Sequence, residues 1–181
     1  MRANWKEKLA HWKSVPYQDF CESNFNKIET YLQENYKISY NSICDIGCGI
    51  ASMPIHFQKR YGSHLYLLEG QGANFYIPMK IIEEELIAQN IGAYTLLDIS
   101  EQDWRKGLKG VKVDLIFSQL AVGYHYAIEN WLEDIKELSH NNTKIFLNYD
   151  LNANKNLLKG AEIVQEVFNN GKCALVEVRV T

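Results

Sequence analysis

Short apolar runs alternate with amphipathic stretches through the middle of the chain. The apolar runs predict five buried strands, at residues 42–46, 64–69, 93–97, 112–117 and 144–148. The stretches between them carry apolar residues at helical spacing and predict helices at 52–61, 74–89 and 128–138, with a loop containing some helix at 101–109. Strands that alternate with helices in this order predict a parallel sheet covered by helices on both faces.

The N-terminal segment has a purely helical pattern. Residues 4–35 predict two helices broken at Pro16, because proline interrupts a helix interior. In the first helix, Trp5, Leu9 and Trp12 recur at helical spacing and are expected to share one face. We expect residues 1–36 to form a helical lid over the rest of the domain.

The C-terminal segment predicts an antiparallel hairpin. After a short helix near 153–159, two β-rich runs at 162–168 and 172–180 flank the tight-turn sequence Asn169-Asn170-Gly171. A helix over 161–168 is the alternative to the first of these strands, because its apolar residues also fit a helical period. The whole pattern predicts one α/β domain, with a doubly wound, mostly parallel seven-stranded sheet in a Rossmann-like core at 40–181.

One loop carries the most informative chemistry. Asp45-Ile46-Gly47-Cys48-Gly49-Ile50-Ala51 lies between the first strand and the first helix of the core. Glycines at this point permit a tight turn and let the backbone approach a ligand closely. Glu69 ends the second strand, where its carboxylate can accept hydrogen bonds from both hydroxyls of a ribose. The loop therefore predicts a nucleoside site.

Two kinds of nucleoside cofactor compete for this loop. A dinucleotide-binding loop has a third glycine where this chain has Ser52, and its anionic pyrophosphate would be repelled by Asp45. S-adenosylmethionine carries an ammonium and a sulfonium group and no phosphate. An acid in the loop favours that cation, although nicotinamide binding would revive an oxidoreductase interpretation.

These residues resemble the class I S-adenosylmethionine-dependent methyltransferases. Asp45, Gly47 and Gly49 match the first motif of that family, with Ala51 in place of the usual third glycine. The resemblance covers about residues 40–181. It implies S-adenosyl-L-methionine as cofactor and S-adenosyl-L-homocysteine as product. The cofactor-binding positions implied by the resemblance are Asp45, Gly47, Cys48, Gly49, Glu69, Gly70, Asp98, Ile99 and Ser118.

Each cofactor position also has an ordinary structural explanation. The glycines could simply end a strand, Glu69 could be a solvated strand end, and Asp98 could cap the segment that follows it. In the family, Glu69 matches the acid that binds ribose, and Asp98 matches the position that meets the adenine amine. All of them fall at carboxyl ends of strands, where open α/β sheets bind ligands.

The loop after the fourth strand is the expected acceptor side. It lacks the Asn/Asp-Pro-Pro-aromatic sequence of amino-group methyltransferases, and it places His125 between Tyr124 and Tyr126. A histidine with a pKa near 6.5 can remove the proton of an alcohol, so His125 is the predicted base or substrate-positioning group. Tyr17, Tyr124, His125 and Tyr126 are the predicted substrate-binding residues. Packing without a chemical role is the alternative for each.

A second, narrower resemblance concerns the acceptor. Val122-Gly123-Tyr124-His125-Tyr126, together with Trp12-Lys13-Ser14-Val15-Pro16-Tyr17, is similar to small bacterial methyltransferases that modify surface polysaccharides. That similarity implies O-methylation of a sugar or a phosphorylated metabolite. An RNA or protein methyltransferase and a non-catalytic S-adenosylmethionine-binding subunit are the alternatives.

The composition restricts the kinds of binding partner that we expect. The net charge of −3 argues against a broad nucleic-acid-binding surface, and no apolar run is long enough to predict a signal peptide or a membrane span. The four cysteines show no metal-site spacing and predict reduced thiols. We therefore expect a cytoplasmic protein with a small-molecule acceptor, no metal, no membrane or nucleic-acid partner, and a homodimer as the assembly to consider.

Overall fold

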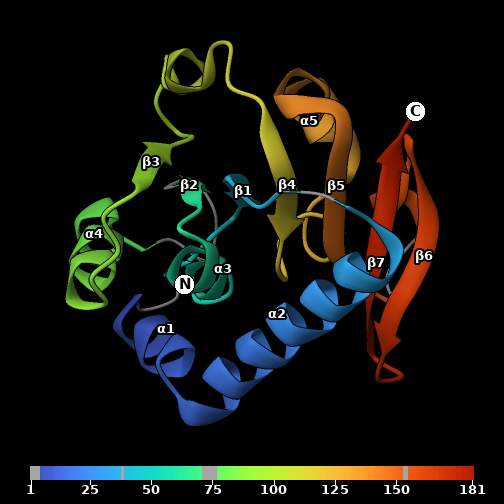
Figure 1. The fold of residues 1–181 in the computed structure, drawn as a ribbon. Coiled ribbons are helices and arrows are strands. Elements are labelled where there is room, and N and C mark those ends of the chain that lie inside the picture. The colour runs from blue at the N-terminus through green and yellow to red at the C-terminus, as the bar shows by residue number, and fades with distance from the viewer. Residues whose placement is uncertain (1–4, 38, 71–76, 153–154) are drawn as a thin grey trace.

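The computed structural model describes residues 5–37, 39–70, 77–152 and 155–181, and within them the strands form a seven-stranded sheet of order β3-β2-β1-β4-β5-β7-β6 (Figure 1). The pairs among β1 to β5 are parallel, whereas β7 runs antiparallel to both of its neighbours. The strands are β1 (Ser42–Ile46), β2 (His64–Glu69), β3 (Tyr94–Asp98), β4 (Val113–Ser118), β5 (Ser139–Asp150), β6 (Ala161–Asn169) and β7 (Cys173–Val180). The predicted fold class and hairpin are confirmed, and a helix over 161–168 is wrong.

Helices cover both faces of the sheet. They are α1 (Trp5–Trp12), α2 (Val15–Asn35), α3 (Pro54–Tyr61), α4 (Met79–Ala88) and α5 (Leu132–Leu138), with 3-10 turns η1 (Trp104–Leu108), η2 (Ile128–Trp131) and η3 (Lys155–Leu158). Side chains of α2, α3 and α4 share one buried cluster with the sheet, and those of η1, η2 and α5 share a second. The sheet is therefore the middle layer of three.

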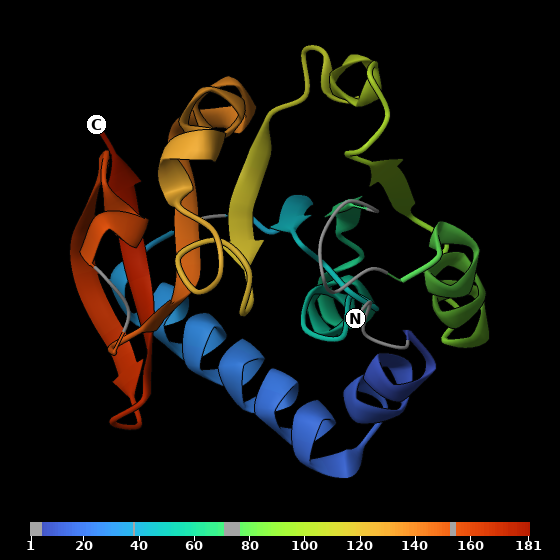
Figure 2. The ribbon, with the colours of Figure 1, turned by 180° about the vertical axis from the view of Figure 1, so that it is seen from behind.

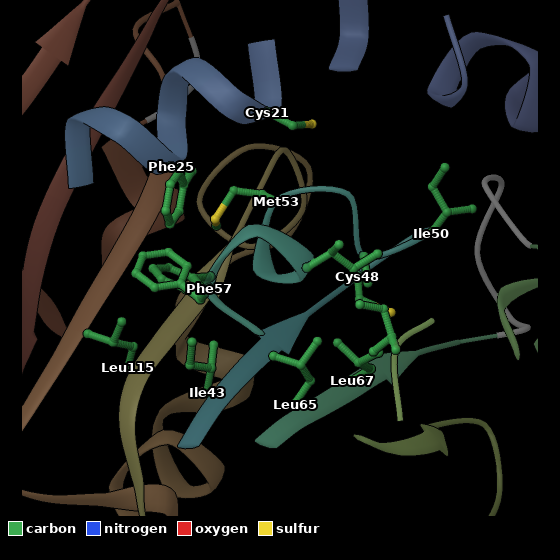
Figure 3. Packing of buried hydrophobic residues seen from close by; sticks show 14 of the residues in the cluster. Cys21, Phe25, Ile43, Cys48, Ile50, Met53, Phe57, Leu65, Leu67 and Leu115 are labelled. Carbon is green, nitrogen blue, oxygen red and sulfur yellow. The ribbon is translucent and has the colours of Figure 1, made fainter. Parts of the chain in front are cut away.

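The central strand shows why an apolar run forms a doubly covered strand. Ile43 packs in the cluster beneath α2 and α3, whereas Cys44 and Ile46 pack in the cluster on the opposite face. Successive side chains of a strand point to opposite faces, so burial on both sides requires consecutive apolar residues. Figure 3 shows the first cluster, where Phe57 meets Phe25 edge to face with ring centroids 4.6 Å apart.

Several predicted boundaries shift, and prolines account for two of the shifts. The helix predicted at 74–89 begins at Met79, because Pro78 is extended (φ −59°, ψ 132°) and disfavours helical geometry before it; residues 74–76 lie outside the described part. Pro16 lies in the first turn of α2 rather than before it, a position where its missing N–H costs nothing. The last predicted core strand is longer than 144–148.

The N-terminal helices do not form a uniform lid. Cys21, Phe25, Ile28 and Leu32 of α2 are buried in the main cluster, so this helix is part of the core. α1 has no buried residue. Figures 1 and 2 show α1 and the start of α2 at the end of the sheet toward which the β4 arrow points. This N-terminal part lies at the carboxyl ends of the strands, whereas the rest of α2 packs on one face of the sheet.

Three further findings apply to the described residues. Within them, no helix has the length and apolar character needed to cross a lipid bilayer. All four cysteines fall in the described part and none forms a disulfide, in keeping with the predicted reduced thiols. No group of three or more histidine, cysteine or acidic side chains there is arranged to hold a metal ion.

Candidate active site

The sheet reverses its winding direction between β1 and β4. From β1 the chain continues to β2 and β3 on one side, and then crosses to β4 on the other. The loops that follow β1 and β4 therefore diverge and leave a crevice, which is where open α/β sheets bind ligands. Two cavities, of about 360 and 230 Å³, open there, and both are lined by Gly47, Glu69, Ala121 and Tyr126. We treat them as adjoining halves of one crevice.

The loop after β1 needs glycine for both conformation and space. Gly47 and Gly49 are left-handed, with φ of +76° and +56°. A Cβ on Gly47 would lie 2.5 Å from the Cβ of Ala121 in the loop after β4. The Gly47 and Cys48 N–H groups donate to the Leu68 carbonyl at 2.8 and 3.1 Å, which ties the loop to the end of β2. Close packing of the two loops thus sets the floor of the crevice.

Glu69 is held in place by backbone N–H groups. Its Oε2 accepts from Gly49 N–H at 2.8 Å and its Oε1 from Gly70 N–H at 3.0 Å. Burial raises the pKa of Glu69, and these two hydrogen bonds oppose that rise. Gly70 must also be small, because an added Cβ would lie 2.7 Å from Cγ1 of Ile99. Glu69, Gly70 and Ile99 all line the larger cavity.

Asp45 is a buried carboxyl group with an unpaired oxygen. It is the last but one residue of β1 and is 2% exposed, and its Oδ1 has no hydrogen-bond partner among the described residues. Burial and the nearby charge of Glu69 raise the pKa of Asp45 to about 8. Buried carboxyl oxygens normally have a hydrogen-bond or ionic partner. The unpaired Oδ1 of Asp45 can therefore accept a hydrogen bond from a ligand or pair with a cation. Two acids at the glycine loop therefore suit a cationic ligand that also carries a ribose.

Three predicted cofactor residues, Asp45, Asp98 and Ser118, line neither half of the crevice. Asp98 accepts hydrogen bonds from N–H and Oγ of Ser100, at 2.9 and 2.5 Å, and faces a separate cavity beside α4. Ser118 is buried, donates to the Ile46 carbonyl at 2.7 Å and accepts from Val122 N–H at 2.8 Å. In this structure Asp98 shapes the turn after β3, and Ser118 ties the loop after β4 to β1. Cys48 does line the smaller cavity.

The loop after β4 brings most of the predicted acceptor residues together. Tyr17, His125 and Tyr126 line the smaller cavity, and Tyr126 also borders the larger one. Tyr124 lines neither of them; its ring packs edge-on against His125, with centroids 4.8 Å apart. Leu120 adopts a left-handed conformation with φ of +58°, which is costly for a branched residue and is typical of functional loops.

Electrostatics around His125 favour its neutral form. Partial burial lowers the pKa of His125, the positive charge of Lys8 lowers it further, and Asp150 opposes both. A lowered pKa leaves the imidazole uncharged at neutral pH, which is the form that accepts a proton. Burial raises the pKa of Tyr17, so its hydroxyl stays protonated and can donate a hydrogen bond.

Several crevice residues were not anticipated from the sequence. Lys8, His11 and Trp12 of α1 line the smaller cavity, as does Gln119 after β4. The Trp12 ring lies 3.4 Å from the position that a Gly49 Cβ would occupy. Positions i, i+3 and i+4 share a helix face, so the signal was present in residues 8, 11 and 12. The apolar positions of this helix, Trp5, Leu9 and Trp12, do not by themselves indicate that Lys8 and His11 lie at the crevice.

Comparison with known proteins identifies the fold. No protein-family profile and no curated protein matches the chain by sequence. Among solved structures, a SAM-dependent methyltransferase from Aquifex aeolicus superposes with a TM-score of 0.62 at 14% identity, covering 84% of this chain and 89% of that one. The chain therefore has a methyltransferase-like α/β fold.

Two other similar structures differ in the acceptors that they are named for. A ribosomal protein L11 methylase from Lactobacillus delbrueckii subsp. bulgaricus gives a TM-score of 0.60 at 13% identity, covering 87% of this chain and 79% of that one. A magnesium protoporphyrin IX methyltransferase from Synechocystis PCC 6803, with bound SAM, gives 0.56 at 14% identity, covering 91% and 79%. The fold is thus compatible with acceptors of very different size.

Proposed function

We propose that the protein is an S-adenosylmethionine-dependent methyltransferase that methylates a hydroxyl oxygen of a small molecule. The observation that carries the proposal is the pair of buried acids, Asp45 and Glu69, at a left-handed glycine loop on the switch point of the sheet. The likeness in fold to methyltransferases supports it. A sugar or a phosphorylated metabolite is the first acceptor class to test.

The glycine-loop side fits the cofactor. Glu69 would hold the ribose hydroxyls between the two cavities, and Gly70 and Ile99 would line the space for the adenine. Asp45 would neutralise the positive charge of the methionine portion, directly or through a donor, because its Oδ1 has no other partner among the described residues. An anionic pyrophosphate would gain nothing from this acid.

The loop after β4 fits the acceptor chemistry. The bound cofactor supplies an electrophilic methyl group on a positively charged sulfur, so the enzyme mainly has to align the acceptor. Tyr17, His125 and Tyr126, which line the smaller cavity, would hold the acceptor hydroxyl in line with that methyl group. Neutral His125 takes the hydroxyl proton. Tyr126 and Tyr17 would shape the space around the acceptor.

A calorimetric titration tests this function directly. The protein should bind S-adenosylmethionine and S-adenosylhomocysteine, and it should bind neither NAD nor NADP. A folded protein that binds neither of the first pair contradicts the proposal, and nicotinamide binding would favour an oxidoreductase. If the protein methylates RNA or a protein and no small molecule, the proposed cofactor is right and the proposed acceptor class is wrong. The cytoplasmic location and the homodimer stay predictions.

A further inference from the structure

One wall of the crevice gathers groups that carry or can acquire positive charge. Lys8 and His11 project from α1 into the smaller cavity, and His125 reaches it from the loop after β4. Lys8 is close enough to His125 for its charge to lower the pKa of that histidine. The acid that lines this cavity, Glu69, accepts hydrogen bonds from Gly49 and Gly70 N–H groups. The cavity therefore presents cationic donors opposite the glycine loop.

α1 is fastened over the crevice by contacts on several sides. Lys13 forms an ion pair with Glu85 of α4. Gln18, at the start of α2, donates to the Trp12 carbonyl and, at 2.9 Å, to Ser52 Oγ beyond the glycine loop. The His11 ring lies against Tyr17, with centroids 5.2 Å apart. These contacts hold Lys8 and His11 at the cavity rather than leaving them on a loose terminal helix.

Acidic and basic side chains are therefore found at different places in the crevice. Glu69 lines both cavities beside the glycine loop and Asp45 is buried close enough to feel its charge, whereas Lys8 and His11 line the smaller cavity from α1. A cation is favoured near the first group and an anion near the second, and the low dielectric of a narrow cavity strengthens both preferences. A neutral acceptor would make no use of the charge on α1.

We propose that Lys8 and His11 form an anion-binding subsite for the acceptor, which is a small hydroxylated compound with a phosphate or a carboxylate group. This inference rests on the proposed methyl transfer. The anion would lie against α1 and direct the hydroxyl group toward His125. Lys8 would act as a point charge, the manner in which lysine commonly binds phosphate, and His11 would donate a hydrogen bond.

Histidine-ring NMR can test the subsite with simple anions. The protein saturated with S-adenosylhomocysteine is titrated with inorganic phosphate and, separately, with sodium acetate, while the ring signals of His11 and His125 are followed. The inference predicts saturable shifts of both rings with at least one anion. A response to phosphate alone identifies a phosphorylated acceptor, and a response to acetate alone identifies a carboxylate. Absence of saturable shifts with both anions overturns the inference.

Three variants separate a specific subsite from general charge effects. Lys8→Gln should weaken anion binding about tenfold, and Lys8→Arg should retain most of it. Lys6→Gln is the matched control, because Lys6 lies on the same helix, is exposed and lines neither half of the crevice. Equal weakening by Lys6→Gln and Lys8→Gln would contradict the inference.

The cofactor itself contains a carboxylate, so its binding must be measured too. Lys8→Gln should leave the affinity for S-adenosylhomocysteine unchanged. If it weakens that affinity but spares 5′-methylthioadenosine, which lacks the amino-acid portion, the cation on α1 binds the cofactor and the inference is wrong. If the unmodified protein binds no S-adenosylhomocysteine, the proposed function fails, and the anion titration of the ligand-free protein still decides whether the subsite exists.

Discussion

The two walls of the crevice are built in different ways. The glycine-loop wall comes from the ends of two adjacent strands, and its key groups, Gly47, Gly49 and Glu69, are fixed by backbone geometry and backbone hydrogen bonds. The opposite wall is assembled from α1 and the loop after β4, so Lys8 and His125 meet through tertiary packing. A local motif can specify the first wall, whereas the second depends on where a helix is placed.

The difference has a functional consequence. A cofactor that is the same in every turnover can be served by a rigid backbone cradle, and an acceptor that varies between proteins can be served by side chains on a helix and a loop. Substitutions of the glycines on the first wall should therefore impair stability and cofactor binding together. Substitutions on the second wall should impair acceptor binding and turnover and leave cofactor binding unchanged.

The largest expected effect is a loss of turnover when His125 on the second wall is replaced. His125→Ala should lower turnover about 100-fold or more, because a positioned base typically contributes that much, while the affinity for S-adenosylmethionine stays unchanged. The rate of the unmodified enzyme should rise with pH as His125 loses its proton. Lys8→Gln should shift that rise to higher pH, since the charge of Lys8 lowers the pKa of His125.

A control and a contradiction accompany this test. His140→Ala should leave turnover unchanged, because His140 is exposed near the start of β5, at the end of the sheet away from the crevice. Loss of cofactor binding in a folded His125→Ala protein would mean that the two walls are not functionally separate.

The next effect concerns packing between the walls. Gly47→Ala should destabilise the fold by about 2 to 4 kcal/mol, from overpacking against Ala121 and from a strained left-handed backbone. Gly62→Ala has the same kind of φ, +72°, but open space around it, so it should cost only about 1 kcal/mol of strain. Urea unfolding measures both. If the two variants are equally stable, the contact with Ala121 does not limit position 47.

Asp45→Asn should move stability and binding in opposite directions. Because the folded-state pKa of Asp45 is raised to about 8, the folded protein binds a proton that the unfolded chain has lost, so stability falls as pH rises toward 8. Asparagine removes that cost and should make the free protein more stable at neutral pH. Cofactor affinity should fall by about 1 to 3 kcal/mol. Asp103→Asn, at an exposed pair with Lys106, should change neither.

The smallest expected effect is at Ala51. Its φ of +56° is left-handed, a conformation that glycine adopts without strain. Ala51→Gly should raise stability by no more than about 1 kcal/mol, because the relief of strain is partly offset by the greater freedom of glycine in the unfolded chain. Thermal unfolding would measure the change. A clear loss of stability would show that the methyl group of Ala51, which is fully buried, contributes more through packing.

Sequence patterns anticipated the sheet better than the site. The apolar run at 112–117, for example, predicted the strand found at Val113–Ser118, because burial on two faces leaves a strong local signal. The start of α4 was missed because the conformation of Pro78 outweighs the helical spacing that precedes it.

Within the site, residues fixed by local backbone were the predictable ones. Gly47, Gly49 and Glu69 line the crevice as expected. Asp98 occupies the expected strand end, yet its side chain bonds to Ser100, a choice that depends on the neighbouring turn. Lys8 could not be placed without knowing where α1 packs.

The affinity for S-adenosylmethionine as a function of pH tests the central claim most directly. If the buried acids form a site for a cationic nucleoside, binding should lower the pKa of Asp45 and release a proton. Affinity should then rise with pH up to about 8, the pKa of Asp45 in the free protein, and Asp45→Asn should flatten that rise. Binding that does not depend on pH, or no binding by the folded protein, would contradict the account.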